Sequence, residues 1–159
     1  LLEQGLLNRL WELISDGLRA FVGQTAFEEI CRTWVLEQAI AGRLPFIPDA
    51  VGRHWSADCE IDVVAINWRE RKILLGECKW GANLVGVEVI RSLIEERGPR
   101  MFARLGEKVW QTTYVFFART GFTVAAQERA ATDGALLLTL STLDADLSQS
   151  TQPTNADVP

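Results

Sequence analysis

The sequence has few of the residues that build zinc sites and disulfide frameworks. Among its 159 residues are one histidine, His54, and three cysteines that form no CxxC pair. A structural zinc site needs four such ligands at close spacing, so we expect none. An odd number of cysteines, with no charged and then apolar signal at the start, is typical of a reducing compartment. These features predict a cytoplasmic protein.

Long apolar runs are also missing. No stretch reaches the roughly 18 apolar residues that a membrane helix needs, so we expect no membrane segment. Apolar residues make up 48% of the chain and charged residues 23%, which is ordinary for a globular domain. This composition excludes a wholly disordered, collagen-like or coiled-coil chain. The length suffices for one domain with a proper core.

Basic residues are absent from the last part of the chain, since no lysine or arginine follows Arg129. The formal net charge of −5, taken alone, argues against a nucleic-acid partner. However, four acids lie after Arg129, which leaves 17 acids against 16 bases in residues 1–129. Of those bases 13 are arginine, the residue best suited to bidentate phosphate contacts. The composition therefore leaves a nucleic-acid partner open.

Hydrophobic periodicity predicts an α/β fold. A helix over residues 2–20 is expected to break at Gly23, and Thr25 is expected to cap a second helix that ends near Ala41. The remaining elements are expected in this order: strands at 51–55, 61–66 and 72–78, a helix at 85–105 weakened near Gly98 and Pro99, a strand at 112–118, a helix at 123–133 and a strand at 135–140. This order predicts a mixed sheet flanked by helices, with an antiparallel three-strand meander first and parallel crossover strands after it.

We divide the chain into three parts on this basis. Residues 1–22 form an N-terminal helix, and residues 23–141 form the α/β domain. Residues 142–159, rich in Ser, Thr, Asp and Pro, are expected to be a disordered acidic tail. Because the chain starts with leucine rather than methionine, it fits either a piece of a longer protein or a solitary domain.

Three charged residues stand out in otherwise apolar strands: Asp62, Glu77 and Lys79. Side chains alternate along a strand, so Glu77 and Lys79 share one face. A hairpin centred on Arg69 would place Asp62 opposite Gly76 or Glu77. Paired carboxylates suit Mg²⁺, which can polarise a phosphoryl oxygen and activate water, and a neighbouring lysine can stabilise the developing charge. The alternative is an ordinary ion pair between Glu77 and Lys79 at a strand end.

Glu28 is a fourth candidate. Its predicted helix buries a face made by Phe27, Ile30, Cys31 and Trp34, and Glu28 lies at the edge of that face. From there it can reach the sheet, whereas Glu29 points to solvent. The alternative role of Glu28 is to complete a capping box with Thr25.

Four segments together resemble the PD-(D/E)xK, or restriction-endonuclease-like, nuclease superfamily. They are residues 27–31 (FEEIC), 52–55 (GRHW), 60–65 (EIDVVA) and 76–80 (GECKW). The closer resemblance is to the domain of unknown function found C-terminal to archaeal-type P-loop ATPases, and it covers roughly residues 20–140. Ile61 stands where the superfamily name has proline.

The resemblance implies a role for each candidate residue. Asp62 and Glu77 match the metal-binding acids, Lys79 the catalytic lysine, and Glu28 a helix glutamate that many members add. The backbone carbonyl of Cys78 would also face the Mg²⁺ or Mn²⁺ ion. DNA is the implied substrate. A P-loop ATPase module in the same or another chain is an implied partner, and such nucleases often act as homodimers. This sequence holds no Walker A motif of its own.

Two other function classes remain open at this point. A non-catalytic nucleic-acid-binding or regulatory module attached to an ATPase would fit the nearly neutral body, which lacks a basic stripe. A protein-interaction domain would instead expose a large apolar patch.

For the remaining conspicuous residues we expect structural roles. Arg53 and His54 are expected at the surface of the meander. The tryptophans at positions 55, 68 and 80 are expected in core or rim packing rather than stacked on bases. The arginines at positions 91, 97, 100 and 104 alternate with glutamates and predict a solvated helix face.

Overall fold

A five-stranded mixed sheet forms the centre of the molecule, in strand order β1-β2-β3-β4-β5. The computed structural model describes residues 2–106 and 108–150. Strands β1 (Ala50–Ser56), β2 (Cys59–Asn67) and β3 (Lys72–Lys79) form an antiparallel meander. Strands β4 (Gln111–Ala118) and β5 (Leu136–Thr139) continue the sheet in parallel. The prediction of a mixed α/β fold with helices around a mixed sheet is confirmed.

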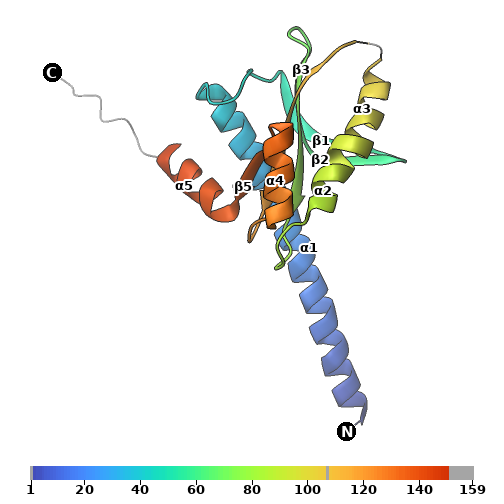
Figure 1. Ribbon diagram of the computed structural model, residues 1–159. Coiled ribbons are helices and arrows are strands. Elements are labelled where there is room, and N and C mark those ends of the chain that lie inside the picture. Colours follow the sequence, from blue (N-terminus) through green and yellow to red (C-terminus); the bar gives the residue numbers. More distant parts are fainter. Residues whose placement is uncertain (1, 107, 151–159) are drawn as a thin grey trace, which may run out of the picture.

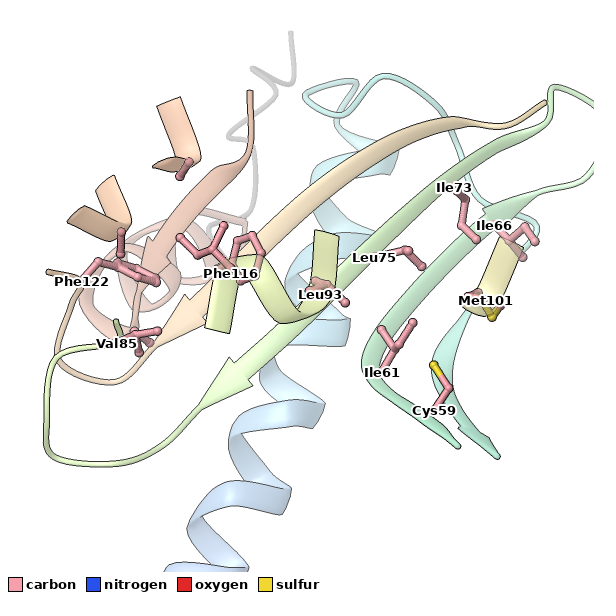
Figure 2. Close-up of a cluster of buried hydrophobic side chains, with 14 residues drawn as sticks. Cys59, Ile61, Ile66, Ile73, Leu75, Val85, Leu93, Met101, Phe116 and Phe122 are labelled. Atoms are coloured by element: carbon pink, nitrogen blue, oxygen red, sulfur yellow. The ribbon is translucent and has the colours of Figure 1, made fainter. Parts of the chain in front are cut away.

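Helices cover both faces of this sheet and enclose a core on each (Figure 1). One face carries α2 (Val87–Arg91), the π-helix η1 (Ser92–Arg97), α3 (Gly98–Leu105) and α4 (Val124–Asp133). Figure 2 shows the apolar side chains of this core, among them Ile61, Ile73 and Leu75 from the sheet. The other face carries α1 (Leu2–Ile40) and α5 (Leu140–Ser150). The helices on each side therefore bury their apolar side chains against one face of the sheet.

The first helix runs without a break from Leu2 to Ile40, so the predicted interruption at Gly23 is wrong. Thr25 lies inside the helix and its hydroxyl donates to the carbonyl of Phe21 (3.0 Å), so it caps nothing. Gly23 has a packing reason, because a Cβ at this position would lie 2.2 Å from Nε1 of Trp80. The boundary between residues 22 and 23 is therefore the interior of one helix, whose N-terminal half projects beyond the sheet (Figure 1).

The predicted disordered tail is also wrong over its first part. Residues 142–150 belong to α5, whose Leu143 is fully buried against α1 and the sheet. Trp34 of α1 donates its indole N–H to Asp146 (2.8 Å). The polar composition hid an amphipathic helix in which Leu143 and Leu147, four residues apart, share one face. The rest of the predicted tail, residues 151–159, lies outside the described residues.

A π-helical turn interrupts the helix that connects β3 to β4, at the place where the sequence predicted weakness. Pro99 lacks an N–H, and its ring would crowd the carbonyl of Glu95 in a regular α-helix. Widening the preceding turn into the π form relieves that crowding. The π spacing brings residues five apart to one side, and Arg97 Nε donates to Ser92 Oγ (3.2 Å).

Candidate active site

The candidate site lies where β2 and β3 separate. Their ladder runs from the pair Asn67–Lys72 to the pair Val63–Gly76 and stops there. Beyond that point β2 stays paired with β1, and β3 stays paired with β4 as far as Lys79. Figure 2 shows β3 turning away from the β1–β2 hairpin that carries Ile61. We call this opening the fork, and Asp62 and Glu77 are the first residues beyond the last pair.

A β-bulge in β2 sets the direction of the Asp62 side chain. Gly52 of β1 pairs with Val64, but His54 pairs with Ile61, so β2 has one residue more than β1 between these pairs. As a result Ile61 belongs to the core under α2 and α3, whereas Val63 belongs to the core under α1. Strict alternation fails at this point, and Asp62 lies at the change of face.

Side chains replace the missing ladder bonds at the fork. The Cys78 N–H donates to Oδ2 of Asp62 (2.9 Å). Arg32 of α1 donates to the Asp62 carbonyl (2.7 Å), and Arg97 of η1 donates to the Glu60 carbonyl (3.1 Å). Backbone groups away from water need such partners. Two arginines from opposite faces of the sheet therefore hold the fork open.

Glu77 is buried, with 4% of its surface exposed, and both of its oxygens are paired. Lys79 lies 2.7 Å from Oε1, and Arg97 lies 2.6 Å from Oε2. The predicted proximity of Glu77 and Lys79 on one face is thus present in the structure. Arg97 was predicted to belong to a solvated face, and that prediction is wrong because the π turn directs it into the fork. The Pro99 that follows was the available signal in the sequence.

Asp62 is the most perturbed carboxyl group of the cluster. Burial and the neighbouring charge of Glu77 raise the pKa of Asp62 to about 7, and the charge of Glu28 adds to this effect. The hydrogen bond from the Cys78 N–H and the charge of Lys79 act in the opposite direction. Three carboxyl groups from α1, β2 and β3 are therefore close enough to influence one another.

Glu28 faces the site from α1, with 16% of its side chain exposed. Its role as a capping partner is wrong, since Thr25 lies inside the helix. Instead, Gln24 Nε2 donates to Oε1 of Glu28 (2.8 Å) and to the carbonyl of Cys78 (3.1 Å). Oε1 of Gln24 accepts the Trp80 N–H (3.1 Å). Gln24, which the sequence analysis did not single out, thus links Glu28 to the carbonyl of Cys78 and to the N–H of Trp80 at the end of β3.

The donor set at the fork suits a hard divalent cation in chemical kind, because it consists of carboxylates and a backbone carbonyl. Burial raises the pKa of Asp62 most, and the charges of Glu77 and Glu28 raise it further; a bound cation would offset the effect of these charges. In residues 2–106 and 108–150, however, no three His, Cys, Asp or Glu side chains are placed to share one ion. Ligation of one ion by Asp62, Glu77 and Glu28 together therefore requires side-chain movement.

Two hollows open next to the fork. One, of about 720 Å³, lies between α1 and the β1–β2 hairpin and is lined in part by Glu28, Arg32 and Arg53. The other, of about 440 Å³, is lined by Glu77, Lys79, Glu88, Val89, Ser92 and Arg97. The cluster therefore borders a hollow on each side of the sheet.

The remaining conspicuous residues have mixed outcomes. Arg53 is exposed, as expected, but His54 is half-buried and its Nε2 has no hydrogen-bond partner among the described residues. Trp80 packs on Phe27, with ring centroids 5.3 Å apart, as expected. Trp55, by contrast, is 74% exposed on the edge strand β1, so its predicted packing role is wrong.

Comparison with known proteins gives a family without an assigned activity. Residues 1–91, more than half of the chain, match DUF234, described as archaea bacterial proteins of unknown function. An uncharacterized protein of Methanocaldococcus jannaschii, MJECL04, is 30% identical over 79 residues, which is 50% of this chain. The match covers only 17% of that relative. No solved structure matches the chain. Among the described residues, no helix is long and apolar enough to cross a membrane. The chain belongs to the DUF234 family.

Proposed function

We propose that this chain is a metal-dependent nuclease domain that hydrolyses phosphodiester bonds of DNA. One observation carries the proposal, namely that Asp62 and Glu77 lie side by side at the fork with Lys79 next to Glu77. The element order supports it, because a helix, a three-strand meander, a crossover helix and a parallel strand also make up the core of the PD-(D/E)xK nucleases. Burying several acids together is costly unless a cation offsets their charge.

In this proposal Asp62 and Glu77 hold a Mg²⁺ or Mn²⁺ ion, with Glu28 and the Cys78 carbonyl as further oxygen donors. The ion, when bound, polarises a phosphoryl oxygen and lowers the pKa of water. Lys79 has 44% of its side chain exposed, so its ammonium group can reach a substrate while it remains next to Glu77. There it orients the attacking water and stabilises the negative charge that develops on the phosphate.

The test is DNA cleavage by Asp62→Asn, which keeps the shape and the acceptor for the Cys78 N–H but removes the charge. Single-stranded, duplex, nicked and branched DNA are incubated with Mg²⁺ or Mn²⁺, and products are separated on denaturing gels. We expect cleavage by the wild type and a loss of about a hundredfold or more in the variant. The matched control is Asp16→Asn, at an exposed position on α1. Equal cleavage by wild type and Asp62→Asn, or none by the wild type, contradicts the proposal.

A second function is favoured by a specific observation, the full pairing of Glu77 with Lys79 and Arg97. A carboxylate with both oxygens paired can serve structure alone. The domain would then be a non-catalytic nucleic-acid-binding or regulatory module attached to a P-loop ATPase. DNA binding that depends steeply on salt, and that is unchanged by Asp62→Asn and by chelators, distinguishes this function from the first.

A further inference from the structure

We propose that Arg97 competes with the divalent cation for Glu77, and that it leaves Oε2 of Glu77 when a metal ion binds. The inference rests on the proposed metal-dependent function. Arg97 then determines how tightly the site holds metal, and it helps to neutralise Glu77 while no metal is bound.

The first argument is occupancy. The Arg97 guanidinium lies 2.6 Å from Oε2 of Glu77, and Lys79 lies 2.7 Å from Oε1. Both oxygens of this buried carboxylate therefore have a cationic partner. A divalent ion placed on Oε2 would come into direct repulsion with the guanidinium, and at such separations in a buried place the repulsion is strong.

The second argument is charge balance. Three carboxylates meet at the fork, those of Glu28, Asp62 and Glu77. Three cationic side chains contact them or the backbone beside them: Arg32, Lys79 and Arg97. Lys79 and Arg97 thus balance Glu77, whereas Arg32 is shared between Glu28 (3.8 Å) and Glu29 (2.7 Å). A divalent ion adds two positive charges, and withdrawal of Arg97 from Glu77 restores part of that balance.

The third argument is that Arg97 has other bonds and room to move. Its Nη1 also donates to the Glu60 carbonyl, and its Nε donates to Ser92 Oγ. Because the contact to Ser92 Oγ uses a different nitrogen from the contact to Glu77, it can keep the guanidinium near the fork after Nη1 leaves Glu77. The hollow of about 440 Å³ that Arg97 lines together with Ser92 and Glu88 gives it space, and Glu88 offers another carboxylate there.

The experiment measures Mn²⁺ binding to the full chain by isothermal titration calorimetry, without DNA, for wild type and Arg97→Gln. We expect Arg97→Gln to bind Mn²⁺ roughly tenfold or more tightly than wild type, because a competing charge is removed. The matched control is Arg100→Gln. Arg100 is exposed on the same helical run and donates to the Asp58 carbonyl (3.0 Å) at the hairpin tip, so its affinity change should be negligible.

A second measurement needs no variant and remains decisive if Arg97→Gln does not fold. In the wild type, the NMR signal of the Arg97 side-chain Nε–H should shift as Mg²⁺ is added, and that of Arg100 should not. Equal or weaker Mn²⁺ binding by folded Arg97→Gln, or an unmoved Arg97 signal at saturating Mg²⁺, overturns the competition. In that case a wild type that binds metal and cleaves DNA leaves the proposed function intact. If neither protein binds a divalent ion, both the competition and the metal-dependent function are overturned.

Discussion

Asp62 combines an irregular backbone position with a perturbed carboxyl group. It lies at a β-bulge, next to two other carboxyl groups, and accepts one backbone N–H. One hydrogen bond does not offset burial and two like charges, so the proton is held more tightly than in water. A residue that destabilises the fold in its ionised form is what a functional site often contains.

The raised pKa of Asp62 predicts that stability falls as the pH rises. The pKa is about 7 in the folded chain against 3.8 for an ordinary aspartate, so between about pH 4 and pH 7 the folded state binds more protons than the unfolded state. Without divalent ions, the free energy of unfolding should decrease across this window by up to about 4 kcal/mol. Urea unfolding at a series of pH values measures it.

Asp62→Asn is the control for this effect, since asparagine does not titrate. We expect the variant to lose most of the decrease and to be more stable than wild type above pH 7. If the two proteins show the same pH dependence, Asp62 does not carry the raised pKa.

At the scale of elements, α1 shows how a glycine can serve packing rather than end a helix. Gly23 lies in the interior of the helix, opposite the indole ring of Trp80, which also packs on Phe27 and under Arg119. The close approach brings Gln24 onto the carbonyl of Cys78 and the N–H of Trp80. Because Gly23 has no side chain, α1 can pack closely against the end of β3, where the candidate site lies.

Gly23→Ala should destabilise the protein although alanine favours helix. The new Cβ would lie 2.2 Å from Trp80 Nε1, so the ring or the helix must shift, and such overpacking costs about 1–3 kcal/mol. At Gly17 on the same helix nothing lies within 4 Å, so Gly17→Ala should stabilise by about 0.5–1 kcal/mol. Chemical denaturation of the two variants measures both values. If Gly23→Ala is more stable than wild type, the indole ring of Trp80 does not pack closely on residue 23.

At the scale of the whole molecule, the candidate residues occupy a shorter part of the sequence than the sheet that supports them. Glu28, Asp62, Glu77 and Lys79 all lie within residues 1–91, the segment that matches the family. The sheet needs more than this, since β3 pairs with β4 over its full length and both cores take residues from β4. The site residues therefore depend on packing from outside the matched segment.

A chain that ends at Leu105 should accordingly fail to fold cooperatively. It keeps every candidate residue but removes β4, α4, β5 and α5, which leaves both sides of β3 without Val115, Phe116 and Phe117. Circular dichroism should show no sharp thermal transition. A chain that starts at Asp16 should keep one, because it retains every described residue of α1 that belongs to a core, the first of which is Phe27. A sharp transition in the chain ending at Leu105 would contradict this account.

The sequence by itself determined the order and type of nearly all elements, because alternation and helical periodicity are local properties. It also predicted that Asp62, Glu77 and Lys79 lie close together, because a short hairpin leaves little freedom in the register of its strands. It failed at Gly23 and at residues 142–150, where the outcome depends on Trp80 and on Trp34, far away along the chain.

Only the tertiary structure decided how the site is completed. Arg32 and Gln24 carry no local pattern that marks them, and both reach the fork from α1, far from Asp62 and Cys78 along the chain. The bulge that directs Asp62 arises from the pairing of β2 with β1, whereas the π turn that directs Arg97 follows from Pro99, and only the fold shows that this turn faces Glu77. Charge balance in a buried cluster is settled among groups distant in sequence, and for that reason it was decided by the fold.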